Sequence, residues 1–237
     1  MNIGVFGASG SIGQRIVDEA LNRGHAVTAM TRDASRVGTK RDGVTWKVAD
    51  ILDMQSVSRV IGDVDVLVNS YGPGPRSDAS GNYLPASVAS AINEAGSLLV
   101  AAQALLKALE QRPSLRLIVV GGAASLEVAP GMQAVDSGPM IMGAIKEFGL
   151  PPEYKAVMDA HRDAMNLYRL SDRNWSYFCP AIITVPGERT GRFRLGVNQP
   201  VLDAGGQSRI SYEDFAVALL DEVEIPSHLR QRFTVGY

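Results

Sequence analysis

Residues 4–17 read GVFGASGSIGQRIV, and the spacing of the glycines in this stretch decides how the chain folds. Gly7, Gly10 and Gly13 are three residues apart, after a short apolar run and before an amphipathic stretch. This order is typical of a strand, a tight turn and the first turn of a helix. The amino-terminal segment is therefore predicted to begin a β-α-β unit.

Each of these glycines has a physical reason to be there. Gly7 permits the tight turn, Gly10 lets backbone N–H groups approach a phosphate without an intervening Cβ, and Gly13 allows the helix to pack closely on the strand. A plain strand-to-helix turn is the alternative. Because a second strand follows within about thirty residues, as the dinucleotide fingerprint requires, we predict that the loop binds the pyrophosphate of a dinucleotide. The predicted contacts are Gly7, Ser9, Gly10, Ser11, Ile12 and Gly13.

Short β-branched runs alternate with longer amphipathic stretches along the rest of the chain. Strands are predicted at residues 3–6, 26–30, 44–48, 64–68, 115–120, 175–179 and 232–235, and helices at residues 12–23, 87–111, 153–170 and 212–222. Ser211 and Asp214 have the spacing of a helix N-cap and its partner, which places the start of the last helix. The alternation predicts a doubly wound parallel sheet of the Rossmann type, in three α/β/α layers. We expect one domain over residues 1–237, with a small carboxyl-terminal region on the substrate side.

The composition excludes several classes of function. The 237 residues carry a formal net charge of -2, without the basic surplus that binding to nucleic acid usually requires. The single cysteine, Cys179, cannot form an intramolecular disulfide, and no apolar run approaches the roughly 20 residues that span a bilayer. With three histidines and one cysteine, no metal-ligand cluster is predicted. We expect a cytoplasmic protein, monomer or homodimer, whose partner is a small molecule rather than nucleic acid or membrane.

The residues after the second strand bear on the choice of coenzyme. An acidic residue at this position binds a ribose 2′-hydroxyl, whereas an arginine accepts a 2′-phosphate. Here Arg32 follows directly after the strand with Thr31 beside it, which favours NADP(H) over NAD(H), although Asp33 leaves NAD(H) open. After the third strand, Asp50 and Ile51 are placed to meet the adenine, and a helix N-cap is the alternative role for Asp50.

Several segments together resemble one family. They are the spacing of Gly7, Gly10 and Gly13, the step Thr31-Arg32-Asp33, Asp50, and the runs GGAASLE at residues 121–127, GERTG at 187–191 and RFTVGY at 232–237. The chain resembles the atypical short-chain dehydrogenase/reductases named as NADH-flavin reductases, relatives of the biliverdin reductase B group. The resemblance implies a Rossmann-type fold, a bound nicotinamide dinucleotide and hydride transfer to flavins or similar planar acceptors. It further implies that the backbone near Pro180 meets the nicotinamide carboxamide.

The sequence lacks the tyrosine–lysine pair that many enzymes of this kind use for proton transfer, and this limits the reactions that it can catalyse. The usual short-chain dehydrogenase protonates a carbonyl with a tyrosine that a lysine four residues later activates, and no tyrosine in this chain has such a lysine. Ser125 and Tyr154 are candidates for a catalytic acid, and the catalytic residues stay unassigned. Reduction of FMN, riboflavin or a quinone needs less from the protein, because orientation and exclusion of water can suffice. The prediction is an NAD(P)H-dependent reductase, with a non-catalytic NADP(H)-binding redox sensor as the alternative.

The acceptor is expected beyond the carboxyl ends of the strands. Ser70, Tyr71 and Gly72 begin a Gly/Pro/Ser-rich stretch to about residue 86, which is predicted to cover the nicotinamide half, and Gly122 follows the fifth strand. Apolar residues after the fifth strand either wall the acceptor or pack on the protein itself: Leu126, Val128, Met132, Met140 and Met142. His161 lies on a mixed helix face, where a buried structural histidine is the expected role.

Overall fold

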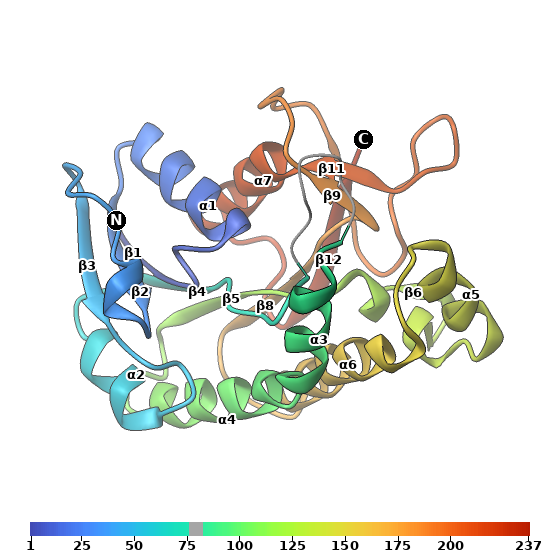
Figure 1. Ribbon diagram of the computed structural model, residues 1–237. Helices are drawn as coiled ribbons and strands as arrows, with labels where there is room; N and C mark the ends of the chain where they lie inside the picture. The colour runs from blue at the N-terminus through green and yellow to red at the C-terminus, as the bar shows by residue number, and fades with distance from the viewer. Residues whose placement is uncertain (76–82) are drawn as a thin grey trace.

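Strands and helices alternate along the chain, which the computed structural model describes for residues 1–75 and 83–237 (Figure 1). The strands are β1 (Asn2–Phe6), β2 (Ala26–Thr31), β3 (Val44–Val48), β4 (Val66–Asn69), β5 (Arg116–Val120), β6 (Glu127–Ala129), β7 (Met132–Gln133), β8 (Trp175–Cys179), β9 (Ile183–Val185), β10 (Arg194–Gly196), β11 (Arg209–Ser211) and β12 (Gln231–Gly236). The α-helices are α1 (Ser11–Asn22), α2 (Met54–Val60), α3 (Pro85–Asn93), α4 (Ser97–Leu109), α5 (Pro139–Glu147), α6 (Lys155–Arg169) and α7 (Tyr212–Glu224). Short 3₁₀ turns include η1 (Ala34–Arg36), η2 (Ala123–Ser125) and η4 (Pro152–Tyr154).

Eight of the strands form one sheet in the order β10-β12-β8-β5-β4-β1-β2-β3. All neighbours in it are parallel except β10, which runs antiparallel to β12 at one edge. The chain order reverses at β1, which has β2 on one side and β4 on the other. A ligand of such a sheet binds at this reversal, beyond the carboxyl ends of the strands. The predicted doubly wound Rossmann-type fold is confirmed.

Helices cover both faces of the sheet (Figure 1). α1 and α7 pack together on one face, and α2, α4 and α6 lie side by side on the other. Alternate residues of a strand point to opposite faces, so Val5 of β1 joins the core under α1 and α7 while Phe6 joins the core on the far side. Phe178 stacks between Phe215 and Phe233, each 4.2 Å away between ring centroids. These apolar layers fix the strand ends that border the site.

The prediction of one long helix over residues 87–111 is wrong in one respect. The structure divides it into α3 and α4, which meet at an angle of 52°. α3 ends at Asn93, with Glu94 as its C-cap, and Gly96 is the N-cap of α4. Apolar residues continue through the break, since Ala95 and Leu98 are both buried, so the hydrophobic pattern carries no signal for it. The break leaves Glu94 at the end of a helix.

Two small sheets are separate from the eight-stranded one. β9 pairs with β11 in a parallel two-stranded sheet, and β6 pairs with β7 in an antiparallel one. α7 begins as predicted, because the Ser211 hydroxyl accepts a hydrogen bond from the backbone N–H of Asp214 at 2.9 Å. No single helix in the described part of the chain is long and apolar enough to cross a bilayer, and α3 and α4 reach that length and hydropathy together, as a bent pair.

Candidate functional site

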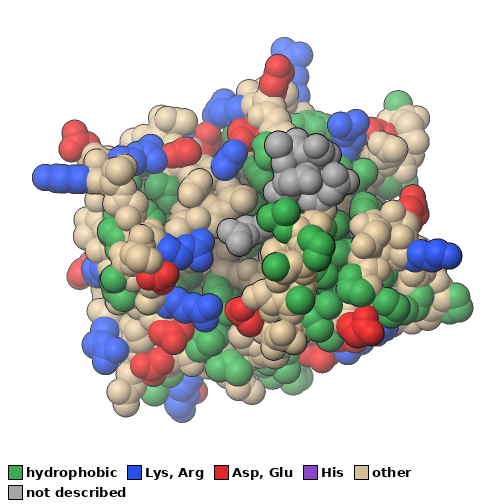
Figure 2. Space-filling view, in the orientation of Figure 1, with side chains coloured by type: hydrophobic (Ala, Val, Ile, Leu, Met, Phe, Trp, Pro, Cys, Tyr) green, Lys and Arg blue, Asp and Glu red, His purple; other side chains and the backbone are tan. Residues whose placement is uncertain are grey.

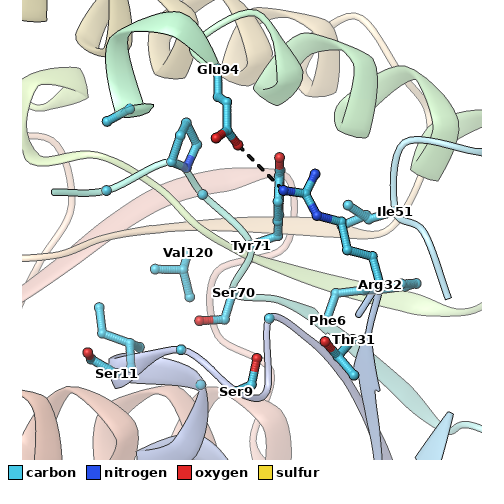
Figure 3. Close-up of a pocket in the computed structure, with 18 of the residues that line it drawn as sticks. Phe6, Ser9, Ser11, Thr31, Arg32, Ile51, Ser70, Tyr71, Glu94 and Val120 are labelled. Atoms are coloured by element: carbon cyan, nitrogen blue, oxygen red, sulfur yellow. Dashed lines mark ion pairs between the residues drawn. The ribbon is translucent and has the colours of Figure 1, made fainter. Parts of the chain in front are cut away.

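A cavity of about 950 Å³ lies at the carboxyl ends of β1, β2, β4 and β5 (Figure 3). It is therefore at the reversal of strand order, where the fold places a ligand. Twelve of the residues predicted to bind a cofactor line it: Gly7, Ser9, Gly10, Ser11, Ile12, Gly13, Thr31, Arg32, Ile51, Ser70, Tyr71 and Gly72. Asp50, Gly122 and Pro180 are not among the described lining residues.

The glycine loop has the geometry that its three glycines require. Gly7 has φ +76°, and a Cβ there would lie 2.5 Å from the backbone oxygen of Ser70. A Cβ at Gly13 would lie 2.1 Å from the backbone oxygen of Gly7, so α1 is packed tightly on the end of β1. At Gly10 a Cβ would meet one atom within 4 Å, the Gly7 oxygen at 3.2 Å, and would otherwise enter open space. The turn at Gly7 and the close packing at Gly13 are confirmed, and Gly10 faces the cavity.

The amino terminus of α1 is open toward a ligand. Gly10 is its N-cap, and within the described residues no side chain accepts a capping hydrogen bond there and no acidic residue lies in the first turn. The N–H groups of a first helical turn lack partners inside the helix and carry partial positive charge. The hydroxyl groups of Ser9 and Ser11 lie on the same loop beside the cavity (Figure 3). This end of the cavity fits an anion such as a pyrophosphate.

The end of β2 carries the second set of polar groups. Arg32 lines the cavity, and Nη2 of its guanidinium lies 3.7 Å from Oε2 of Glu94 (Figure 3). Asp33 turns its carboxylate elsewhere: Oδ1 accepts hydrogen bonds from the N–H of Ser35 at 2.9 Å and from its hydroxyl at 2.7 Å. These bonds to Ser35 lower the pKa of Asp33. The carboxylate that the sequence left open as a ribose ligand is thus the N-cap of η1.

A similar local role accounts for Asp50. Its Oδ1 accepts a hydrogen bond from the N–H of Leu52 at 2.9 Å, and its own N–H donates to the hydroxyl of Ser56. The N-cap of α2 is Asp53 rather than Asp50. Ile51, one residue further, is buried and lines the cavity. The expected contact of Asp50 with adenine is therefore not supported by its position, whereas that of Ile51 fits.

The opposite end of the cavity lies over β4 and β5. Tyr71 donates a hydrogen bond from its hydroxyl to Oγ of Ser97 at 2.9 Å, which holds the ring against the wall. Val120 and Gly121 line this end, and a Cβ at Gly121 would lie 2.1 Å from the ring of Tyr177. Gly122 is the residue that the sequence predicts to bind the cofactor. A Cβ at this position would lie 3.0 Å from the ring of His161. Gly122 therefore packs against His161 of α6, which itself lines the cavity, and its contact with the cofactor stays a prediction.

His161 is a lining residue that sequence reasoning assigned to the core. Its Nδ1 lies 3.3 Å from the hydroxyl of Tyr177, and that hydroxyl donates to the backbone oxygen of His161 at 3.0 Å. Desolvation lowers the pKa of the imidazole to about 4, so the ring is neutral at neutral pH. A single histidine on a helix face is usually structural, and the spacing offered no signal that this one borders a cavity. Two other lining residues, Glu94 and Tyr212, also come from helix ends and were not predicted.

The candidate catalytic acids, Ser125 and Tyr154, are not among the described lining residues of the cavity. Ser125 is fully buried in η2, and its backbone oxygen accepts a hydrogen bond from Arg232. Tyr154 is the N-cap of α6 and packs against two core clusters, where desolvation raises the pKa of its phenol. Lys155, beside it, forms an ion pair with Asp159 at 2.8 Å. None of these three side chains is among the described lining residues.

The apolar residues after β5 do not wall this cavity. Leu126 is fully buried in the core, whereas Met132 and Met140 are exposed by 48% and 61%. Figure 2 shows hydrophobic side chains gathered on the surface over α3 and α5, where the exposed residues are Tyr83, Leu84, Met140 and Met142. Of the predicted covering stretch, residues 70–75 and 86–87 border the cavity, and residues 76–82 lie outside the described residues. Across the described chain, no three His, Cys, Asp or Glu side chains are grouped to hold a metal ion.

Comparisons with known proteins agree with this geometry. The profile of the NAD(P)H-binding family matches residues 7–223. Protein YwnB of Bacillus subtilis (strain 168), itself uncharacterised, is 34% identical over 239 residues, which cover 99% of this chain and 98% of the relative. A solved structure from Burkholderia pseudomallei, named as a candidate exported protein, is 38% identical with a TM-score of 0.78 and full coverage of both chains. A candidate epimerase from Bacteroides thetaiotaomicron is 30% identical with a TM-score of 0.78, covering 100% of this chain and 96% of its own.

Two more distant structures share the fold. One, from Streptococcus pneumoniae TIGR4, is named as a candidate NADH-flavin reductase; it is 24% identical, with a TM-score of 0.76 and coverage of 100% and 99%. The other is a short-chain dehydrogenase/reductase from Veillonella parvula DSM 2008, in complex with NADP, at 17% identity, a TM-score of 0.66 and coverage of 100% and 94%.

Proposed function

The chain belongs to the NAD(P)H-binding family, and from this premise we propose that it is a reductase that transfers hydride from NADPH to a flat conjugated acceptor such as FMN, riboflavin or a quinone. One observation carries the proposal. The cavity runs from Arg32, past the uncapped amino terminus of α1, to Val120 and His161. Along the cavity these groups lie in the same order as the 2′-phosphate, the pyrophosphate and the nicotinamide of NADP(H).

Residues of this chain would hold the dinucleotide along the cavity. The first-turn N–H groups of α1 would donate to the pyrophosphate, and the φ of Gly7 and the open side of Gly10 shape the loop to let it approach. Arg32 and Arg36 border the adenosine end, and a guanidinium binds a phosphate through charge-assisted hydrogen bonds. Ile51 and Ala49 offer an apolar floor for adenine. The named complex of the Veillonella protein with NADP supports this choice of ligand for the fold.

The nicotinamide end favours an acceptor that needs no acid from the protein. A bound reduced nicotinamide supplies hydride. At this end the described lining includes backbone and the side chains of Tyr71, Val120 and His161. The Tyr71 hydroxyl donates to Ser97, and the imidazole is neutral because desolvation lowers its pKa to about 4. Such a site can orient two flat rings and exclude water, and solvent can protonate a reduced flavin. The name of the Streptococcus protein supports a flavin as acceptor.

The same features argue against epimerisation, which the name of the Bacteroides relative would suggest. Epimerisation and carbonyl reduction need a positioned acid or base. Tyr154 lies outside the described lining and has Met158, not a lysine, one helical turn later. The chain therefore lacks the tyrosine-lysine dyad that would supply the proton.

A second candidate function is a redox sensor that binds NADP(H) without turning it over. The exposed apolar side chains over α3 and α5 favour it, because a sensor passes its state to a partner surface (Figure 2). The two candidates bind the same dinucleotide and differ in turnover. In either role the free, buried Cys179 fits a reducing compartment, and we place the protein in the cytoplasm. Both a monomer and a homodimer are compatible with the proposal.

Steady-state oxidation of NADPH separates the candidates. Purified protein is mixed with NADPH and, in turn, FMN, riboflavin and a quinone, and a Gly10→Val protein serves as the control for the cavity. We expect at least one acceptor to accelerate oxidation well above buffer with the natural protein and not with the control. Tight NADPH binding with no acceleration by any acceptor would favour the sensor. Absence of dinucleotide binding would contradict both.

A further inference from the structure

Arg32 and Glu94 face each other across the adenosine end of the cavity. Arg32 follows β2, and Glu94 comes from the opposite wall, at the end of α3 (Figure 3). Their Nη2 and Oε2 atoms are 3.7 Å apart, and both side chains are about half exposed, at 53% and 41%. The pair therefore bridges the two walls at the place where the 2′ position of a bound adenosine is read.

Glu94 is held in this position by a second contact. Its Oε1 accepts a hydrogen bond from the hydroxyl of Ser90 at 2.7 Å, which leaves Oε2 directed at Arg32. Ser90 and Glu94 are one helical turn apart and both line the cavity. The carboxylate is thus positioned by α3 rather than placed at random on the surface.

Glu94, and not Asp33, is the acidic residue that pairs with Arg32 at this end of the cavity. Asp33 caps η1 and is not among the described lining residues. This acidic group comes from the end of α3, 62 residues after Arg32 in the chain. Arg36, the other arginine at this end, donates to the backbone oxygen of Ser9 at 3.5 Å and does not neutralise Glu94.

We propose that Glu94 is a specificity-determining residue that limits the preference for NADPH over NADH; the inference rests on the proposed function. A 2′-phosphate carries a charge of about -1.5 to -2 at neutral pH. When it binds to Arg32 it competes with Glu94 for one guanidinium and brings two anions close together. A 2′-hydroxyl adds no charge and leaves the ion pair intact. Glu94 therefore opposes NADPH and is neutral toward NADH.

The size of the effect follows from the exposure of the pair. Two anions that share one exposed guanidinium repel through water and salt, which corresponds to about a three- to tenfold change in binding at ordinary ionic strength. The effect should shrink as salt is added, because exposed charges are screened. A buried pair would produce a larger change with less dependence on salt.

The test is a titration of Glu94→Gln with NADPH and with NADH, followed by protein fluorescence or calorimetry. Glu110→Gln is the matched control, because Glu110 is likewise the C-cap of a helix in an exposed ion pair, with Lys107 at 2.7 Å, and is not among the described lining residues. We expect Glu94→Gln to bind NADPH about three- to tenfold more tightly, with NADH changed less than about twofold and a weaker gain at high salt. Glu110→Gln should change the binding of neither NADPH nor NADH.

Three results would overturn the inference. They are unchanged NADPH binding in Glu94→Gln, weaker NADPH binding, which would make Glu94 a support for Arg32, and weaker NADH binding, which would make Glu94 a ligand of the ribose. A natural protein that binds neither dinucleotide would instead refute the proposed function, and the inference with it. Since the natural protein is titrated in the same series, the two kinds of failure are told apart.

Discussion

Replacement of Gly10 by valine should abolish dinucleotide binding and leave the fold in place. Gly10 has φ -81° and ψ 168°, an extended conformation that a β-branched residue adopts without strain. Its Cβ would meet the Gly7 oxygen at 3.2 Å and otherwise enter the cavity. The methyl groups of valine would therefore occupy the space through which a pyrophosphate reaches the backbone.

The expected loss of binding free energy follows from the hydrogen bonds to the pyrophosphate that are lost. A hydrogen bond to a charged group contributes about 1.5–3 kcal/mol, so loss of two N–H contacts from the first turn of α1 should weaken binding by about 3–6 kcal/mol. This corresponds to a rise in Kd of at least about a hundredfold. The small contact at 3.2 Å should cost no more than about 1 kcal/mol of stability, which is a fall in Tm of about 2–4 °C for a chain of this length.

Two glycines serve as controls. Gly62→Val should change neither NADPH binding nor thermal stability, because a Cβ there would meet nothing within 4 Å and Gly62 is outside the described lining. Gly13→Ala should destabilise the fold by about 1–3 kcal/mol, since its Cβ would lie 2.1 Å from a backbone oxygen. Binding is measured by titration with NADPH and stability by thermal unfolding. A Gly10→Val protein that melts like the natural protein and binds NADPH equally well would refute the assignment of the loop.

Three further predictions concern single side chains. Arg32→Ala should raise the Kd for NADPH about ten- to a hundredfold and that for NADH less than about twofold, measured by parallel titration; equal losses for both would mean that Arg32 does not read the 2′-phosphate. Tyr154→Phe should lower turnover with FMN by less than about tenfold, because the phenol is buried away from the described lining; a stopped-flow rate reduced a hundredfold, with NADPH affinity intact, would make Tyr154 an acid. His161 has a pKa lowered to about 4 from an ordinary 6.5, so its neutral form contributes stability that is complete above pH 6.5 and is lost as the pH falls toward 4. Unfolding by denaturant should therefore show a loss of about 1–3 kcal/mol across this window that His161→Gln reduces, and an equal loss in the variant would count against it.

The main sheet could be predicted from sequence because each of its central strands is an apolar run between turn signals. The break between α3 and α4 could not, since buried alanine and leucine residues continue through it. The small strands β9, β10 and β11 have three residues each, too few for a periodic pattern. Their pairing depends on tertiary contacts that no local signal contains.

Some residues of the site could likewise be predicted from the sequence, and others could not. Residues at the ends of β1, β2 and β4 follow from the fold, because a Rossmann sheet places its ligand there. Gly121 lines the cavity after β5, whereas Gly122 packs against the ring of His161 and is not among the described lining residues. Glu94, His161 and Tyr212 reach the cavity from helices whose positions are set by packing. Their role depends on where the helix ends lie, which the sequence does not specify locally.

In the proposed function, the cavity holds NADPH so that hydride passes to a flat acceptor without a protein acid. A single-turnover experiment tests it most directly: protein saturated with NADPH is mixed without oxygen with FMN in a stopped-flow instrument. We expect reduced nicotinamide and oxidised flavin to disappear together, in equal amounts and at one rate, and deuterium at the transferred position of nicotinamide C4 to slow both. Saturated binding of NADPH with flavin reduction no faster than in buffer would contradict it.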